Sequence, residues 1–344
     1  MTSILIVTDA WHPQINGVVR SLERTAEELR ARGLRIEFLT PAVFRTLPCP
    51  TYPEIRLSLT TAATVLQRVE AAACDHLHIA TEGPLGMMAR AAALKTGRVF
   101  TTSYHTRFPE YLSARLPVPL SWSYAWLRRF HNAGQGCMVA TRSLEDDLRA
   151  RGFTHLMRWS RGVDETLFKP YHDSVLPDDL PRPVFMNVGR VAVEKNITAF
   201  LDLDLPGSKV VVGAGPQLDS LRKAYPDVLF TGPKVGEDLA RHYASADVFV
   251  FPSLTDTFGN VLLEALACGI PVAAFPVMGP LDVIGGTDAG VLSEDLRQAA
   301  LDALEVSRAA CRRVALHYTW AASADAFLSN VLAAQQAAGC RGAA

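Results

Sequence analysis

The chain has 344 residues, enough for two domains that each bury a core of ordinary size. Its formal net charge is −1, from 34 Lys and Arg against 35 Asp and Glu, so overall charge gives no reason to expect nucleic-acid binding. None of its six cysteines forms a C-x-x-C pair, which excludes that kind of zinc or redox motif and favours reduced thiols in a cytoplasmic protein.

The first residues are typical of a β-strand. The run 4–8 is apolar for only about five residues and has no basic leader, so we do not expect a signal peptide. Nothing later supplies about 18 uninterrupted apolar residues, so we expect no transmembrane helix. A soluble chain of this kind can still lie on a membrane surface.

Short apolar runs alternate with longer helical stretches, which is the pattern of βα units around a parallel sheet. A helix is predicted over 18–32, ending at Gly33. The predicted strands of the first half are 4–8, 36–40, 76–80, 99–103 and 136–140. Those of the second half are 184–189, 209–215, 228–232, 247–253 and 271–275.

A proline-rich stretch with several acids separates the two series and predicts a linker over 166–183. We therefore expect an α/β protein with two Rossmann-like, doubly wound domains, 1–165 and 184–318, that face a cleft. A last helix and tail, 319–344, could pack back onto the first domain, although periodicity alone does not decide this.

The stretch SLTDTFGNVLLEALACGIP places two carboxylates, Asp256 and Glu264, eight positions apart. Thr255 or Asp256 is a plausible N-cap for a helix from about 258 to 268, which Gly269 would end. Eight helical residues rise about 12 Å, roughly the span of a sugar diphosphate.

The start of that helix suits an anion or a hydroxyl-rich ligand, because its free N–H groups and dipole point outward. The amides of Phe258, Gly259 and Asn260 and the Asp256 carboxylate could hold a hexose, while Glu264 accepts both ribose hydroxyls. The alternative is that Asp256 is only a cap and Glu264 only a surface acid.

Two cations follow the predicted strand 184–189. Arg190 comes directly after Gly189 and Lys195 five residues later, on a loop at the carboxyl end of a strand, where open α/β sheets bind ligands. Arg can bind a diphosphate with two N–H groups and Lys adds a mobile charge, so both could stabilise a departing nucleoside diphosphate without a metal. The alternative is two solvated surface charges.

Taken in order, these segments resemble the large family of retaining, nucleotide-sugar-dependent glycosyltransferases of GT-B fold, family 4 type, which includes sucrose-phosphate synthases, mannosyltransferases and bacterial glycolipid synthases. The resemblance covers nearly the whole chain. It rests on the ordered set TDAWHPQINGVVRS (8–21), SYHT (103–106), RGVDETLF (161–168), VVVGAGPQLDSL (210–221) and FPSLTDTFGNVLLEALACGIPV (251–272).

The resemblance implies a role for each residue of the donor site. Arg190 and Lys195, after Gly189, would bind the donor diphosphate, and Glu264 the ribose. Asp256 and the amides of 258–260 would hold the donor sugar. The usual motif is Glu, seven residues, Glu; here Asp stands first, and its side chain is one methylene shorter.

Four residues of the first half complete the candidate site. Gly17, opening a helix after the first strand, would let the backbone approach the donor phosphate; the alternative is a turn glycine. Asp9 could face the acceptor, with Arg107 on the acceptor side. The resemblance implies that His105 contacts the transferred sugar, although a lone His after a strand is more often a buried ring.

Positive charge is concentrated between residues 90 and 135, with seven Lys or Arg against one acid, Glu110. Within it a predicted helix over 119–134 carries an aromatic face edged by arginines, which could lie on an anionic membrane with its indoles at headgroup level. Its residues are Trp122, Trp126, Leu127, Arg128, Arg129 and Phe130. The alternative is that the aromatics pack in the core; the loop 106–119 would form the acceptor entrance.

Other candidates for chemistry are weaker. Asp202 and Asp204 are interpreted as solvated acids rather than metal ligands. His76 and His78 share a strand face without a third ligand nearby and are interpreted as structural. GAGP (213–216) has too few glycines for a dinucleotide fingerprint.

The sequence thus predicts a cytoplasmic, peripheral-membrane, retaining glycosyltransferase. It would need no metal or other cofactor and would move a hexose from a nucleoside-diphosphate sugar, UDP first, to a lipid hydroxyl such as that of diacylglycerol. GDP-mannose as donor, a soluble sugar or polysaccharide acceptor, an epimerase using His105 and Glu110, and a non-catalytic sugar-nucleotide-binding subunit remain alternatives. The base, sugar, acceptor and oligomeric state are left open.

Overall fold

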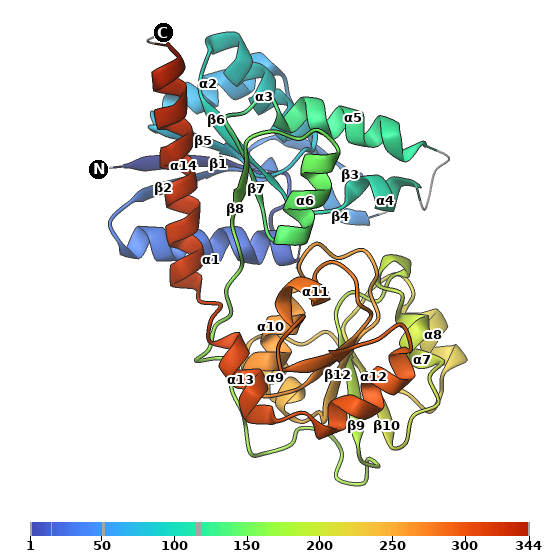
Figure 1. The fold of residues 1–344 in the computed structure, drawn as a ribbon. Coiled ribbons are helices and arrows are strands. Elements are labelled where there is room, and N and C mark those ends of the chain that lie inside the picture. The colour runs from blue at the N-terminus through green and yellow to red at the C-terminus, as the bar shows by residue number, and fades with distance from the viewer. Residues whose placement is uncertain (1, 15, 50–51, 114–117, 343–344) are drawn as a thin grey trace. The chain divides into compact units, whose positions relative to one another are not determined.

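The computed structural model describes residues 2–14, 16–49, 52–113 and 118–342, and it divides into two compact units (Figure 1). Unit 1 comprises Met1–Arg161 and Trp320–Ala344, and unit 2 comprises Gly162–Thr319. Each unit is an α/β layer structure built on its own parallel sheet, which confirms the predicted pair of Rossmann-like folds.

The sheet of unit 1 has six parallel strands in the order β2-β1-β5-β6-β7-β8. An antiparallel hairpin, β3–β4, stands apart from it. The bounds are β1 Ser3–Val7, β2 Arg35–Leu39, β3 Arg45–Cys49, β4 Tyr52–Leu59, β5 His76–Ile79, β6 Phe100–Tyr104, β7 Gly136–Val139 and β8 Leu156–Arg158. The helices are α1 Gly17–Ala31, α2 Ala62–Ala72, α3 Pro84–Thr96, α4 Phe108–Ser113, α5 Leu120–His131, α6 Arg142–Ala150 and α14 Trp320–Gly342, with the 3-10 turn η1 Pro41–Val43.

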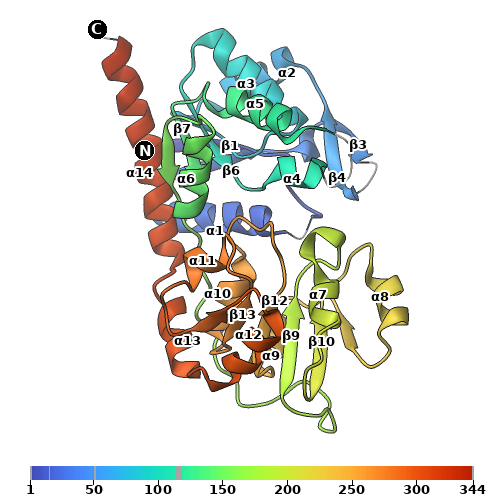
Figure 2. The same cartoon turned by 45° about the vertical axis from the view of Figure 1, so that its right-hand side comes forward.

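Alternate residues of the inner strand β1 pack into two cores, because successive side chains of a strand point to opposite faces. Leu5 and Val7 pack with α2, α3 and α5. Ile4 and Ile6 pack with α1 and α14. Figure 2 shows α2, α3 and α5 together on one side of these strands and α1 on the other.

The C-terminal helix α14 belongs to unit 1, which answers the question that periodicity alone left open. Phe327 of α14 is fully buried against the sheet, and the indole N–H of Trp159 donates to Ser323 Oγ at 3.1 Å. Figure 1 shows the helix running beside α1 and the strands.

The sheet of unit 2 has the order β11-β10-β9-β12-β13-β14, again all parallel. The strands are β9 Val184–Val188, β10 Ser208–Val212, β11 Leu229–Gly232, β12 Val248–Phe251, β13 Val272–Ala274 and β14 Gly290–Leu292. The helices are α7 Ile197–Leu201, α8 Leu218–Ala224, α9 Gly236–Ala244, α10 Asn260–Ala267, α11 Pro280–Val283, α12 Leu296–Asp302 and α13 Arg308–Ala315, with the 3-10 turns η2 Val193–Lys195 and η3 Ala303–Glu305.

Helices also cover both faces of the second sheet. α7, α8 and α12 pack on one face through a cluster that includes Phe185 and Val250. α10 packs against α9, α13 and the strands β12 and β13, and its residues from 262 to 267 are all buried. Helix α10 is therefore fixed in position over most of its length.

Candidate active site

The two loops that carry the predicted donor residues meet at the switch point of the second sheet. β9 and β12 are neighbours, and the chain leaves them toward opposite edges, β10 on one side and β13 on the other. Ligands of open α/β sheets bind where the strand order reverses in this way, at the carboxyl ends. Gly189 to Lys195 follow β9, and the segment 252–259 follows β12.

The loop after β9 lies directly on the loop after β10. Val191 N–H donates to Ala214 O at 2.9 Å, and Gln217 N–H donates to Val191 O at 3.1 Å. A Cβ on Gly213 would lie 1.8 Å from Gly189 O, and one on Gly215 would lie 2.3 Å from Val191 O. These two glycines therefore permit the backbone contact that supports the loop bearing Arg190.

The same loop is joined to the one after β12. Asn196, in the left-handed conformation at φ 52°, donates from Nδ2 to Pro252 O at 3.0 Å. Lys195 Nζ lies 2.5 Å from Asp256 Oδ1. Within the described residues, the other carboxylate oxygen of Asp256 is buried without a hydrogen-bond partner. The predicted diphosphate-binding Lys and the predicted sugar-binding Asp thus occupy one site.

The helix after β12 begins later than predicted. α10 starts at Asn260, and its N-cap is Gly259 at φ 84°, so neither Thr255 nor Asp256 caps it, contrary to the sequence prediction. Gly259 can adopt this conformation because it has no Cβ. Only about 6 Å of helix rise therefore separates Asn260 from Glu264, and Asp256 lies in the preceding loop.

Glu264 is a buried carboxylate, 4% exposed, which rules out a surface acid. It accepts a hydrogen bond from the hydroxyl of Tyr243, on α9, at 3.0 Å. Phe258 is also buried, and its ring lies 6.1 Å from that of Tyr318. A buried carboxylate one helix turn from an N-terminus suits a ligand that brings its own hydroxyl donors.

In unit 1, Asp9 lies at the corresponding switch point, after β1 and beside β5. Its carboxylate accepts from the N–H groups of Leu85 and Gly86 at 2.8 and 3.0 Å and from the Thr81 hydroxyl at 2.9 Å. It therefore caps α3, and burial raises its pKa even though these hydrogen bonds oppose the rise. Both of its oxygens are engaged within the protein.

The other predicted residues of unit 1 lie in different settings. Gly17 is the first residue of α1 and is exposed; the preceding loop contains residue 15, which lies outside the described residues. Arg107 donates through Nε and Nη2 to Glu110 Oε1, at 3.1 and 2.7 Å. His105 follows β6, and its Nδ1 lies 3.0 Å from a guanidinium nitrogen of Arg161.

The aromatic helix is α5, and it is split between core and surface. Trp122 and Trp126 are 72% and 42% exposed, and Arg128 and Arg129 are also exposed; these four residues are called the α5 outer face below. Phe130 is 2% exposed in the core with α3, so its assignment to a membrane-facing surface is wrong.

The basic segment around α5 is partly committed to internal hydrogen bonds. Arg90 donates to the carbonyls of Phe130 and Arg129, and Arg128 donates to Arg151 O at 2.9 Å. Part of the loop predicted as the acceptor entrance, residues 114–117, lies outside the described residues, and so does Arg115.

The structure also describes the residues that the sequence indicated as weaker candidates for metal ligands. Asp202 and Asp204 are exposed. His78 is fully buried between the hydroxyls of Thr101 and Ser103, at 2.8 and 2.9 Å. In the ranges that the structure describes, no three His, Cys, Asp or Glu residues are grouped so that they could hold a metal ion.

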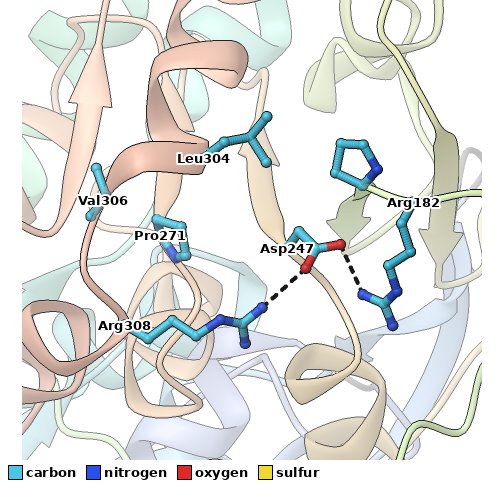
Figure 3. Close-up of a pocket in the computed structure, with 7 residues that line it drawn as sticks. Arg182, Asp247, Pro271, Leu304, Val306 and Arg308 are labelled. Carbon is cyan, nitrogen blue, oxygen red and sulfur yellow. Dashed lines mark hydrogen bonds and ion pairs between the residues drawn. The ribbon is translucent and has the colours of Figure 1, made fainter.

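A cavity of about 360 Å³ in unit 2 lies elsewhere (Figure 3). Its lining includes Pro183, Asp247 and Pro271, each of which directly precedes a strand, so it opens at the amino edge of the sheet. The candidate donor residues follow their strands and lie at the carboxyl edge. Figure 3 shows Asp247 between Arg182 and Arg308, at 2.8 and 3.2 Å.

Two residues of the site were missed from the sequence. Tyr243 holds Glu264, and Arg161 contacts His105, yet both come from segments distant in the chain. Arg161 stood within the quoted segment RGVDETLF, but a charge there gave no sign of burial. The glycines of GAGP were noted but assigned no role, and backbone contact is the role that the structure shows.

Comparison with known proteins identifies the class. Residues 15–167 match the family model "Glycosyltransferase Family 4", and residues 182–306 match "Glycosyl transferases group 1". A GDP-mannose-dependent alpha-mannosyltransferase of Mycobacterium tuberculosis is 30% identical over 315 residues, 84% of this chain and 83% of that protein. The chain belongs to the family 4 glycosyltransferases and is a glycosyltransferase.

Two further relatives carry names that indicate other substrates. Sulfoquinovosyl transferase SQD2 of Arabidopsis thaliana is 32% identical over 258 residues, covering 70% of this chain and 50% of that protein. Alpha-monoglucosyldiacylglycerol synthase of Streptococcus pneumoniae is 24% identical over 313 residues, covering 78% and 70%.

Solved structures show the same fold. Sucrose-phosphate synthase from Thermosynechococcus elongatus superposes with a TM-score of 0.74 at 20% identity, over 98% of this chain and all of that one. HepE from Anabaena, in complex with UDP-glucose, gives 0.72 at 14% identity, over 97% of this chain and all of that one. The fold is GT-B. Within the described ranges, no helix is both long and apolar enough to cross a membrane.

Proposed function

We propose that the protein transfers a hexose from a nucleoside-diphosphate sugar to a hydroxyl of a membrane lipid, with retention of configuration and without a metal. The observation that carries this proposal is the meeting of Lys195 and Asp256 at the switch point of the second sheet, next to the start of α10. The cation proposed for the diphosphate and the carboxylate proposed for the sugar are joined directly by one hydrogen bond.

Each donor residue then has one task. Arg190 and Lys195, after Gly189, bind the diphosphate, and the N-terminus of α10 adds its dipole. Glu264, buried and held by Tyr243, accepts the two ribose hydroxyls. Asp256 uses its unpartnered buried oxygen for a sugar hydroxyl, together with the amides of 258–260.

The same cations stabilise the leaving group. As the bond between the sugar and the diphosphate breaks, negative charge grows on the diphosphate, and preorganised positive groups lower the barrier. Gly17 would admit the backbone of α1 close to the phosphate, and His105 would contact the sugar. No residue is assigned as general base; the departing phosphate takes the proton from the acceptor hydroxyl.

For the donor, the comparisons favour GDP-mannose over the UDP-hexose expected from the sequence. The Mycobacterium tuberculosis relative, aligned over more than four-fifths of both chains, is named for its dependence on GDP-mannose. A UDP-hexose stays the second candidate, since that donor class is consistent with the same diphosphate and ribose contacts.

For the acceptor, the surface of unit 1 favours a lipid. The α5 outer face presents two exposed indoles beside two exposed arginines, which suits the headgroup region of an anionic leaflet. One relative is named as a synthase of a glucosylated diacylglycerol. Arg107 is proposed on the acceptor side, whereas the bonded carboxylate of Asp9 supports α3.

Calorimetry tests the donor assignment first. GDP, UDP and ADP are titrated into the wild type and Glu264→Ala, with EDTA present. The proposal expects GDP to bind most tightly and the variant to lose at least about tenfold in affinity, because ribose hydrogen bonds to a carboxylate are charge-assisted. Binding that requires a divalent metal, or that is unchanged in the variant, contradicts it.

A product assay tests the acceptor and the stereochemistry. Labelled GDP-mannose or UDP-glucose is incubated with the enzyme and either vesicles containing diacylglycerol and phosphatidylglycerol or a soluble sugar. Label in the organic phase, with an α-linkage by NMR, supports the proposal. Label only in the aqueous product, or a β-linkage, overturns the lipid acceptor or the retaining mechanism, respectively.

A further inference from the structure

Arg161, the last residue of the first segment of unit 1, is a buried guanidinium, 6% exposed. Its Nη1 donates to Trp159 O at 2.9 Å, and its Cζ lies 4.3 Å from the centroid of the Trp159 ring. Among the residues that the structure describes, no carboxylate forms an ion pair with it. Burial accordingly lowers its pKa to about 9, which leaves it charged at neutral pH.

The other contact of this guanidinium is with an imidazole. Nη2 of Arg161 lies 3.0 Å from Nδ1 of His105. Because arginine has donors and no acceptor, Nδ1 must supply the lone pair, and the proton of a neutral His105 must lie on Nε2. Protonating His105 would place an N–H against an N–H and add a second buried positive charge.

Burial and neighbouring charges also disfavour the protonated form of His105. The Trp159 ring packs against the imidazole in a T-shaped arrangement, with 5.6 Å between the ring centroids. Burial, followed by the charges of Arg161, His78 and His131, lowers the pKa of His105 well below its usual range. His131 itself is paired with Glu82 at 3.0 Å, so that carboxylate serves another ring.

We propose that Arg161 is a positioning residue that holds His105 as the neutral Nε2–H tautomer, so that His105 can only donate a hydrogen bond to the sugar and takes no part in proton transfer. This inference rests on the proposed contact of His105 with the transferred sugar. It also counts against the epimerase alternative, because an epimerase would need His105 as an acid or base.

Nitrogen NMR of protein labelled at histidine tests the tautomer. It needs neither the sugar-nucleotide substrate nor an activity assay. His105→Gln identifies the resonances. In the wild type the chemical shifts of the two ring nitrogens of His105 should stay far apart from pH 5.5 to 8.5, and the proton should lie on Nε2. A proton on Nδ1, or titration near the ordinary His pKa, overturns the proposal, whatever the substrate of the enzyme proves to be.

Variants of Arg161 test its role. Arg161→Lys keeps a group with donors only and should retain the tautomer, whereas Arg161→Met removes the donor to Nδ1 and should let the proton occupy either ring nitrogen. We expect kcat/KM to fall by roughly a hundredfold in the Met variant and by less than about tenfold in the Lys variant.

Thermal unfolding separates a positioning role from a structural one. If Arg161→Met does not fold, the comparison of wild type and Arg161→Lys by NMR still decides the question. Equal loss of activity in both folded variants, with an unchanged His105 tautomer, would show that Arg161 only supports the packing of Trp159.

Discussion

Lys195 and Asp256 are joined by an ion pair of 2.5 Å between Nζ and Oδ1. The ammonium that we assign to the diphosphate is therefore already neutralised by the carboxylate that we assign to the sugar. A diphosphate that enters this site must share or displace Asp256 on Lys195, so nucleotide binding and sugar recognition are linked through one hydrogen bond.

This linkage predicts opposite effects of two substitutions on nucleotide binding. Lys195→Met should weaken nucleoside diphosphate binding about tenfold or more, because a charge-assisted hydrogen bond is lost. Asp256→Asn should leave that affinity unchanged or higher, since the ammonium is released, and yet lower kcat/KM for the nucleotide sugar. Calorimetry and kinetics on the same samples measure both; equal weakening by the two variants would contradict the linkage.

Glu264 and the ribose can be tested as a pair. Glu264→Gln should lower nucleoside diphosphate affinity about tenfold, and removing the 2′-hydroxyl of the ligand should do the same to the wild type. The deoxy ligand should cost the variant little more, because the two changes remove one interaction. Tyr243→Phe is the matched control. It should lower the free energy of unfolding by about 1 kcal/mol and should lower nucleotide affinity by less than Glu264→Gln does. Additive losses would place the ribose elsewhere.

Gly213 supports the loop of Arg190 by close backbone contact. Gly213→Ala should lower both the unfolding temperature and nucleotide affinity, because its Cβ would lie 1.8 Å from Gly189 O in a backbone of φ 148°. Gly339→Ala, in α14 with nothing within 4 Å, should instead raise stability by about 0.5–1 kcal/mol. Thermal unfolding and calorimetry give the readouts, and normal nucleotide affinity in Gly213→Ala would contradict this role.

The α5 outer face can be removed without touching the core. Trp122→Ser with Trp126→Ser should abolish flotation with vesicles of phosphatidylglycerol while leaving the unfolding temperature nearly unchanged, because both indoles are exposed. Phe130→Ala is the contrast: it should cost about 3–5 kcal/mol of stability as a buried aromatic. If the wild-type protein does not float with these vesicles, the membrane assignment is contradicted.

Acid should destabilise unit 1 through His78. Burial, with a smaller effect of Arg161, lowers the pKa of His78 to about 3. The unfolded state therefore binds a proton below about pH 6.5 that the folded state does not, and stability falls with pH by about 2 kcal/mol between pH 7 and 5. Chemical unfolding should show a smaller fall for His78→Asn; an equal slope in both would exclude this cause.

The sequence predicts the sheets well because buried parallel strands are nearly continuous apolar runs. All ten predicted strands are present, and no end differs from the prediction by more than three residues. β8 and β14 were missed because three-residue edge strands carry too short a pattern. The β3–β4 hairpin was missed because prolines, such as Pro48, argue against a strand.

The sequence predicted the site residues whose location follows from their position after a strand. It missed those whose location depends on packing. Arg190, Lys195 and Asp256 follow strands, so the topology places them at one edge. The cap of α10 depended on Gly259 at a positive φ, which no local pattern marks. Phe130 was misplaced because eight helical residues turn about 80° past whole turns, so it faces away from Trp122.

The membership of α14 in unit 1 also affects how the chain can fold as it is made. Unit 2 is one continuous segment, Gly162–Thr319, and all of it has been synthesised before α14 begins. Unit 1 needs Phe327 and its neighbours to cover the face of a sheet whose strands were made first. During translation, the half of the protein that leaves the ribosome first must therefore wait for the last helix before its core is closed.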